Sequence, residues 1–419
     1  MNVSRTVLAV FLVLAGSVVP VGTAVAANQQ ANAYAGTHVS FEAHDGAVVD
    51  YAVDDETVLQ SVAVQSQSDA ESNGDADADV GLSAVTAVTG SGLSVDSRTS
   101  VGATVTAENG ATMQAHDDPR GILVVRSGGN PRYVTANVSS STRTEQASEK
   151  RVVVTTDDGT EGTFIVVGDG DVTVNDRGNV SADLGSDGTL VFRSYPDGRD
   201  ETAAKQERLI ADGTATAEVY VMRGSDASGE LAADVVDYGQ QTSVDVTEKG
   251  EGTVRMTVDR SRHEGTVVIT SVSESAMESV EDLSVTVDGD AAARASSYGE
   301  LRSATSGDTS KFLVRQQSSA DANADVLVAV NHFSTREITM TRSDSSESDS
   351  GSDDVTATDS SESDSGSDDV TATDSSESGS SGGDAGGSAE TTSFDSPGFG
   401  VGVAVVALLA AALYARRRR

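Results

Sequence analysis

Five histidines are the side chains best suited to acid–base or metal chemistry in this chain, at positions 38, 44, 116, 263 and 332. His263-Glu264 lacks the second histidine four residues on that a zinc-binding metalloprotease helix needs. His116-Asp117-Asp118 could be a fragment of a metal site, but an exposed acidic turn is the simpler interpretation. We therefore predict no catalytic residue and no cofactor. A triad of serine, histidine and aspartate from distant positions stays open, because geometry and not sequence reveals one.

Three alternating aspartates, Asp75, Asp77 and Asp79, imitate the opening of a calcium-binding loop. In such a loop alternate carboxylates converge on one hard cation. The match then fails, because Val80 stands where the sharp-turn glycine is expected and Thr86 where a bidentate glutamate would be. We predict no metal site and keep this weak calcium candidate as the alternative.

Two segments match the acceptor pattern for N-glycosylation, Asn137-Val138-Ser139 and Asn179-Val180-Ser181. Both lie beside expected strand ends. Asn137 and Asn179 are therefore glycosylation candidates, and the alternative is that both are ordinary surface asparagines.

The elements that must position these residues are mainly strands. Between residues 37 and 341, short segments rich in Val and Thr recur and are closed by Gly, Asp or Asn. Many alternate apolar and polar side chains, as residues 253–258 do, which is the period of a half-buried strand. The expected fold class is mainly β, with one or two antiparallel β-sandwich-like domains and one or two short helices.

Two segments predict helices and one predicts a loop. Residues 200–211 begin with acids, contain good helix formers and end before Asp212-Gly213, so they predict a helix of about three turns. Residues 291–303 are a weaker helix candidate. Residues 65–79 are rich in Asp, Ser and Gly and predict a long loop.

The domain plan divides the chain at changes of composition. We expect a β-rich ectodomain at 27–278 and a small terminal β unit with a helix at 279–342. Residues 343–396 predict a disordered acidic stalk rich in Ser and Thr, because the sequence of 344–358 recurs unchanged at 359–373 and offers almost nothing to bury.

Composition limits the partners and the environment. The net charge is −38, which would oppose compaction at moderate salt, whereas the Debye length of about 3 Å at 1 M salt screens it in brine. This predicts a halophilic protein and no nucleic-acid partner, because phosphates would meet a negative surface. With no cysteine, the chain has no disulfide, thiol nucleophile or cysteine-ligated metal.

The N-terminus has the features of a signal peptide at residues 1–26. A short basic region precedes the apolar residues 7–19, and Ala24 and Ala26 fit the small-residue rule for cleavage before Ala27 by signal peptidase. The alternative is an uncut membrane anchor, although Pro20 and Gly22 interrupt the apolar run.

The C-terminus combines Pro397-Gly398-Phe399 with an apolar run and four arginines, Arg416 to Arg419. The run predicts a transmembrane helix at 400–415, and the arginines a stop-transfer signal that leaves the preceding chain outside the cell. This tail, residues 397–419, resembles the PGF-CTERM sorting signal of haloarchaeal surface proteins. The resemblance implies that an archaeosortase recognises the Pro-Gly-Phe tripeptide and that a lipid anchor replaces the helix. The alternative is a permanent single-pass helix.

The functional prediction is a non-enzymatic, glycosylated envelope protein anchored at its C-terminus on the extracellular face of the cytoplasmic membrane. An S-layer-associated structural role, an adhesive role or a ligand-binding role would fit, and the ligand is unknown. The alternatives are a surface-tethered extracellular hydrolase and a calcium-dependent binding module. A deep cleft where a histidine meets two or more carboxylates would favour the hydrolase.

Overall fold

The computed structural model describes residues 32–73, 81–223, 230–239, 241–250, 252–277, 280, 282–316, 324–332 and 335–342. These residues belong to one compact unit and are mostly strand, as the alternation of side chains predicted. No helix within the described ranges is long and apolar enough to cross a membrane. The leader, the stalk and the helix expected at 400–415 lie outside the described residues.

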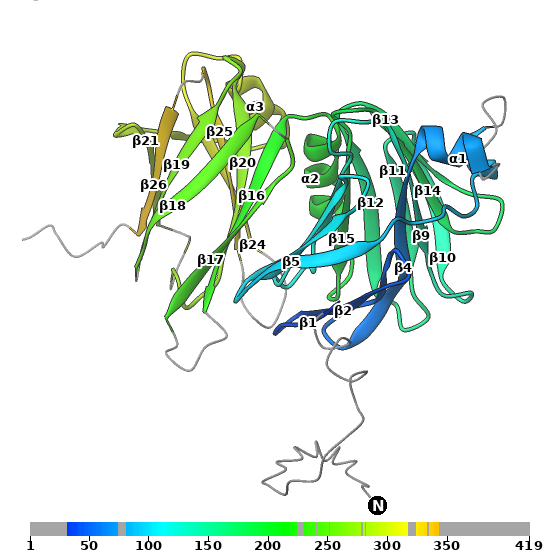
Figure 1. Ribbon diagram of the computed structural model, residues 1–419. Helices are drawn as coiled ribbons and strands as arrows, with labels where there is room; N and C mark the ends of the chain where they lie inside the picture. The colour runs from blue at the N-terminus through cyan, green and yellow to red at the C-terminus, as the bar shows by residue number, and fades with distance from the viewer. Residues whose placement is uncertain are drawn as a thin grey trace, which may run out of the picture. The chain divides into compact units, whose positions relative to one another are not determined.

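The first two sheets form the N-terminal sandwich (Figure 1). Sheet 1 has the order β1-β2-β3-β4-β9-β14-β13 and sheet 2 the order β10-β11-β12-β15-β8-β7-β6-β5. The strands of sheet 1 are β1 (Ala33–Ala35), β2 (Val39–His44), β3 (Ala47–Val53), β4 (Glu56–Ser66), β9 (Arg132–Asn137), β13 (Gly170–Val174) and β14 (Val180–Leu184). Those of sheet 2 are β5 (Leu93–Thr99), β6 (Gly102–Ala107), β7 (Thr112–His116), β8 (Leu123–Arg126), β10 (Arg143–Ser148), β11 (Arg151–Thr155), β12 (Glu161–Val167) and β15 (Thr189–Tyr195).

The interior of this sandwich is apolar. Along β2 the side chains of Val39, Phe41 and Ala43 are buried while their neighbours are more exposed, which is the alternation of a strand with one face in a core. Phe164 and Phe192 from sheet 2 lie in the same core, with ring centroids 5.0 Å apart. Burial of this apolar surface stabilises the pairing of the two sheets.

The other two sheets form the C-terminal sandwich. Sheet 3 has the order β17-β16-β20-β25-β24-β23 and sheet 4 the order β18-β19-β26-β21-β22. The strands of sheet 3 are β16 (Ala215–Arg223), β17 (Leu231–Asp237), β20 (Thr266–Val272), β23 (Ala293–Arg294), β24 (Lys311–Gln316) and β25 (Ala324–Val330). Those of sheet 4 are β18 (Thr242–Gly250), β19 (Thr253–Arg260), β21 (Leu283–Val287), β22 (Asp290–Ala291) and β26 (Thr335–Arg342). Two pairs in sheet 3 are parallel, β16 with β20 and β23 with β24, so the pairing is not antiparallel throughout.

The division expected at residue 278 falls inside these two sheets. β16 and β20, which precede it, share sheet 3 with β24 and β25, which follow it. In sheet 4, β19 likewise pairs with β26. Residues 279–342 therefore complete the sheets that residues 215–272 begin.

A third core lies between sheets 2 and 3 and contains two helices, α2 (Glu201–Ala211) and α3 (Tyr298–Ala304). Figure 1 shows α2 between the sandwiches, and its Leu209 and Ile210 are buried there. Because sheets 2 and 3 each have a core on both faces, β15, β20 and β25 are buried along their whole length.

The helix predicted at 200–211 is confirmed as α2, with Asp200 as its N-cap accepting from the Ala203 N–H. The candidate at 291–303 is confirmed only at its end, because β22 and β23 occupy its start. The loop expected at 65–79 is wrong in its first half. β4 continues to Ser66 and is followed by α1 (Gln67–Asn73), where Ser66 Oγ accepts from the Asp69 N–H in the first turn.

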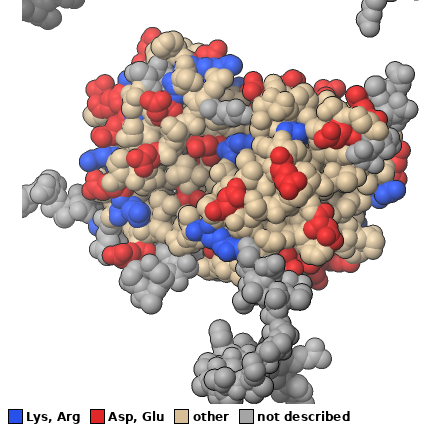
Figure 2. Space-filling model, viewed as in Figure 1, with Lys and Arg blue, Asp and Glu red and all other residues tan. Residues whose placement is uncertain are grey.

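Acidic side chains are spread over the surface. Figure 2 shows them scattered across one face of both sandwiches, with fewer Lys and Arg between them. The negative charge therefore does not mark a single binding patch on this face.

Candidate functional site

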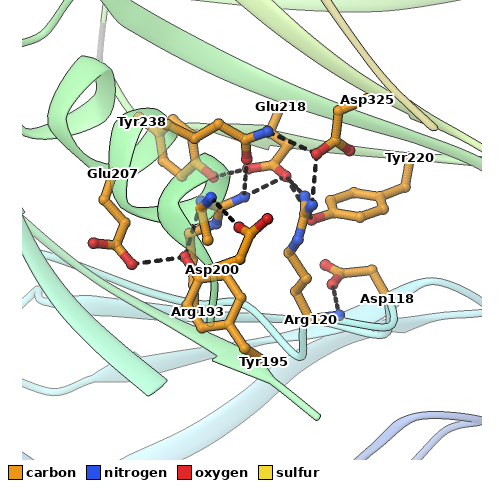
Figure 3. Close-up of polar contacts among 12 residues, drawn as sticks. Asp118, Arg120, Arg193, Tyr195, Asp200, Glu207, Glu218, Tyr220, Tyr238 and Asp325 are labelled. Atoms are coloured by element: carbon orange, nitrogen blue, oxygen red, sulfur yellow. Dashed lines mark hydrogen bonds and ion pairs between the residues drawn. The ribbon is translucent and has the colours of Figure 1, made fainter. Parts of the chain in front are cut away.

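The most unusual feature of the ectodomain is a network of buried ions between sheets 2 and 3 (Figure 3). Its centre is Glu218 on β16, which is fully buried. Glu218 Oε1 accepts from Arg193 Nη2 of β15 at 2.8 Å and from Arg120 Nη1, in the loop between β7 and β8, at 2.5 Å. Two arginines of the N-terminal sandwich therefore converge on one carboxylate of the C-terminal sandwich.

Two tyrosines complete the surroundings of Glu218. The Tyr220 hydroxyl donates to Oε1 at 2.6 Å, and the Tyr238 hydroxyl donates to Oε2. Burial alone would raise the pKa of Glu218, but Arg193 and Arg120 outweigh it and lower this pKa to about 2. Glu218 is thus an ionised carboxylate with both oxygens occupied.

A second carboxylate, Asp325 on β25, connects Arg120 to the helix. Asp325 Oδ2 accepts from Arg120 Nη2 at 2.8 Å and from Gln206 Nε2 of α2 at 2.6 Å. Arg120 thereby contacts two strands of sheet 3 through separate nitrogens, a use of the guanidinium fork that lysine could not reproduce.

Glu207 on α2 forms the third centre and holds the helix on sheet 2. It binds the Arg199 guanidinium through two contacts of 2.6 and 2.7 Å, and it accepts from the hydroxyls of Thr163 at 2.9 Å and Tyr195 at 3.0 Å. Burial opposes ionisation of Glu207, but the Arg199 contact lowers its pKa. Helix α2 is therefore held both by ionic contacts of Glu207 and by the apolar packing of Leu209 and Ile210.

A cavity of about 180 Å³ opens beside this network. Arg120 and Asp325 line it, together with Asp200 and Gln206 at the start of α2. Arg120 and Asp325 are already paired with each other, and Asp200 caps the helix. No histidine is among its lining residues, so this cavity lacks the convergence of histidine and carboxylates that would favour a hydrolase.

The segment His116-Asp117-Asp118 is buried, so the interpretation as an exposed acidic turn is wrong. Asp117 accepts from three consecutive backbone N–H groups, those of residues 37–39, each at 2.7 Å. Asp118 accepts from the Arg120 N–H at 2.7 Å, and burial, with Asp234 and Glu218 nearby, raises its pKa well above the usual range. The turn is buried because both sandwiches close over it.

His116 itself pairs with a carboxylate of the other sandwich. Its Nδ1 lies 3.0 Å from Asp234 Oδ2 on β17. The remaining histidines lie elsewhere: His38 pairs with Asp54 at 2.8 Å, while His44, His263 and His332 are exposed. The structure does not bring two histidines into one site among these contacts.

The two glycosylation patterns lie side by side, because β9 and β14 pair with Ala136 opposite Val180. Asn137 is partly buried and its Nδ2 donates to Ser61 Oγ at 2.8 Å. Asn179 Oδ1 accepts from the backbone N–H of residue 138 at 3.1 Å, and Ser181 is fully buried. Both acceptors are thus engaged in the folded sheet, and the pattern at Asn179 is the more enclosed.

Several predicted site residues lie outside the described residues. They are Ala24, Ala26 and Ala27 of the leader, the aspartates Asp75, Asp77 and Asp79, the tripeptide Pro397, Gly398 and Phe399, and the arginines Arg416, Arg417, Arg418 and Arg419. Within the part of the chain that is described, no group of three or more His, Asp or Glu could hold a metal ion.

Sequence reasoning missed the ions of the network, although the chain carries a signal for them. Arg193, Glu218 and Asp325 are each a charged residue inside a largely apolar strand segment. A charge in a strand that is buried on both faces needs a partner of opposite sign.

Comparison with known proteins identifies the tail. Residues 396–418 match the PGF-CTERM motif, and no curated protein matches the chain. The motif marks C-terminally anchored cell-surface proteins of archaea that an archaeosortase processes. This chain is therefore a surface protein held at the membrane by its C-terminus, while the comparison leaves the ectodomain without a family.

Proposed function

We propose that the protein is a non-enzymatic component of the cell envelope, whose two sandwiches act as one rigid body in a structural, adhesive or ligand-binding role. The buried ion network carries this proposal. Glu218, Asp325 and Glu207 join sheet 2, sheet 3 and α2 through contacts of 2.5 to 3.2 Å, and a shared apolar core surrounds them. Hinge motion between the sandwiches would separate these ions from one another. Each would lose its partner of opposite charge, which costs free energy.

The role can be tested in cells that carry the leader, the stalk and the tail but lack residues 32–342. We expect weaker attachment to solid surfaces or lower resistance to osmotic shock than in cells with the full chain, at equal surface abundance. Unchanged attachment and unchanged resistance would contradict the role. Turnover of peptide, ester or glycan substrates by the purified full chain in high salt would instead favour the hydrolase.

We also propose that the tail is removed after Phe399, that a lipid anchor replaces it, and that the protein is glycosylated and works in brine. The PGF-CTERM match, the two acceptor asparagines and the net charge of −38 support these steps. Intact-mass measurement of the cell-associated protein should find the segment after Phe399 missing and a lipid-sized addition. A C-terminus that still ends in Arg419 would exclude the replacement.

Glycan mapping tests the two acceptors separately. We expect occupancy at Asn137 to exceed that at Asn179, because Ser181 of the second pattern is fully buried and its Oγ accepts from Asn175 Nδ2 at 2.9 Å. Ser139 of the first pattern is only partly buried. Peptide mass mapping checks this, and higher occupancy at Asn179 would show that attachment precedes folding of the sheet.

A further inference from the structure

The strand that precedes the membrane anchor is the central strand of sheet 4. β26 ends at Arg342, and the chain then continues to the PGF-CTERM motif at 396–418. In the order β18-β19-β26-β21-β22 this strand has a neighbour on each side. Tension on a C-terminal anchor is transmitted along the covalent chain. It therefore enters the folded ectodomain through β26 before it reaches any other described strand or helix.

β26 is hydrogen-bonded to both of its neighbours. Residues 335–341 pair with residues 253–259 of β19, and residues 338–342 pair with residues 283–287 of β21, both in antiparallel register. Hydrogen bonds between antiparallel strands run perpendicular to the strand axis. A pull along the axis of β26 therefore loads the bonds of both ladders together, whereas an edge strand can share the load with one ladder only.

Further contacts hold β26 at its two ends and on its inner face. The Arg342 N–H donates at 2.9 Å to a carbonyl oxygen in the turn between β18 and β19. Near the other end, Asp288 Oδ1 accepts from the Glu337 N–H at 2.8 Å. Ile338 and Met340 are fully buried in the core of the C-terminal sandwich. A pull that lifts β26 off the sandwich must break both ladders and bring these two apolar side chains into water.

The N-terminal strand is built in the opposite way. β1 (Ala33–Ala35) is short, and it is the edge strand of sheet 1 beside β2. A pull from this end would first break one short ladder, up to the N–H groups of residues 37–39 that Asp117 binds. Of the two terminal strands, the one that leads to the anchor is thus the one that is held on both sides.

We propose that β26 is a mechanical clamp, a strand whose two ladders share the load and keep the C-terminal sandwich folded while tension acts on the membrane anchor. A surface protein with a structural or adhesive role carries such tension between its anchor and whatever the ectodomain holds. The proposal rests on that form of the proposed function and deepens it.

Single-molecule force measurements on the full chain, in detergent and high salt, test the clamp. The chain has no cysteine, so two introduced thiols give unique attachment points for the handles. Ser343→Cys places one handle directly after β26. Ser261→Cys places the other just after β19, at the end of sheet 4 where β26 begins, so that the pull shears β26 against β19.

The control changes only the direction of the pull. Ser284→Cys places the second handle on β21 directly opposite Thr341, so that a pull against Ser343→Cys opens β21 and β26 from one end. In this geometry the bonds break one after another. We expect the rupture force to be severalfold higher with the handle at 261 than with the handle at 284.

Two matched variants separate the clamp from general stability. Ile338 on β26 and Ile269 on β20 are both fully buried. With the handles at 261 and 343, Ile338→Ala should lower the rupture force, whereas Ile269→Ala should leave it unchanged. If an alanine variant does not fold, Ile338→Val and Ile269→Val make the same comparison with a smaller loss of packing.

Three outcomes overturn the proposal. The first is an equal rupture force in the two pulling directions, and the second is an equal loss of force in the variants at 338 and 269. The third is detachment of β26 in a separate step at low force before the rest of the sandwich unfolds. None of these outcomes changes the attachment test of the proposed function, so the two proposals fail separately.

Discussion

The interior of the N-terminal sandwich and the layer between the two sandwiches are equally shielded from water but are built from different side chains. The sandwich core is packed with Val, Leu, Phe and other apolar groups. The layer between sheets 2 and 3 combines an apolar core with fully buried ions, among them Arg193 and Glu218. Apolar packing tolerates many arrangements, whereas an ion pair is satisfied in few. The layer between the sandwiches should therefore be the part that fixes their relative position.

Glu218→Ala should be the most damaging single change, because it leaves Arg193 and Arg120 without their shared partner. We expect a loss of about 3–5 kcal/mol in the free energy of unfolding, as for other broken buried pairs. Leu59→Ala in the sandwich core should cost about 2–5 kcal/mol through the cavity it creates. Denaturant unfolding in high salt measures both.

The matched control is Glu201→Ala on the exposed side of α2, where Lys205 lies 3.6 Å away. This change should stay within about 0.5 kcal/mol. If Glu218→Ala costs no more than Glu201→Ala, the network does not join the sandwiches. A second unfolding transition in Glu218→Ala alone would show that the sandwiches had become independent.

The outer sheets of the two sandwiches, sheets 1 and 4, could be predicted from the sequence because many of their strands have one wet and one dry face. Residues 253–258 alternate apolar and polar side chains, and they form β19, with Val254, Met256 and Val258 buried. Helix α2 was predictable for a similar reason, since its acidic N-cap and its good helix formers are local signals. These signals can be recognised without knowing which distant parts of the chain pack against the element.

The layer between the sandwiches could not be predicted in the same way. Strand β15 is buried on both faces, so alternation gives no information about what covers its second face. Arg193 pairs with Glu218, and helix α2 lies between their two strands in the sequence. Arg120 pairs with Asp325, which is separated from it by an even longer stretch of sequence. Local patterns can indicate that each charge needs a partner, but only the packing of sheet 2 on sheet 3 selects which one.

The hydroxyls of two buried tyrosines donate to different kinds of acceptor, one charged and one neutral. The Tyr238 hydroxyl donates to the ionised Glu218, whereas the Tyr51 hydroxyl, in the sandwich core, donates to the Gly121 carbonyl oxygen at 3.1 Å. Tyr238→Phe should cost about 1.5–3 kcal/mol and Tyr51→Phe about 0.5–1.5 kcal/mol. Denaturant unfolding of both variants measures the difference, and equal losses would mean that the network gains nothing from its charge.

The smallest expected effect is a pH dependence of the free energy of unfolding. Two acids of the layer between the sandwiches, Asp237 and Glu218, change this stability with pH in opposite directions. Burial raises the pKa of Asp237 on β17 to about 6, although Arg126 and His116 oppose the shift. The folded protein therefore holds this proton at a pH where the unfolded chain, with the usual value of 3.8, has released it. Stability falls as pH rises from 3.8 to about 6. Glu218 acts oppositely: its contribution is complete above 4.5 and is lost as pH falls toward about 2.

Asp237→Asn removes the first of these two contributions and keeps the second. The variant should match the wild type near pH 4 and exceed it above pH 6 by about 1 kcal/mol, a value reduced for the partial exposure of this side chain. Unfolding midpoints across this range measure the gain, and the exposed Asp176→Asn controls for the loss of one negative charge. A constant difference between Asp237→Asn and the wild type at all pH values would mean that Asp237 ionises alike in both states. The pH dependence of this layer would then come from other groups, Glu218 and Asp118 among them.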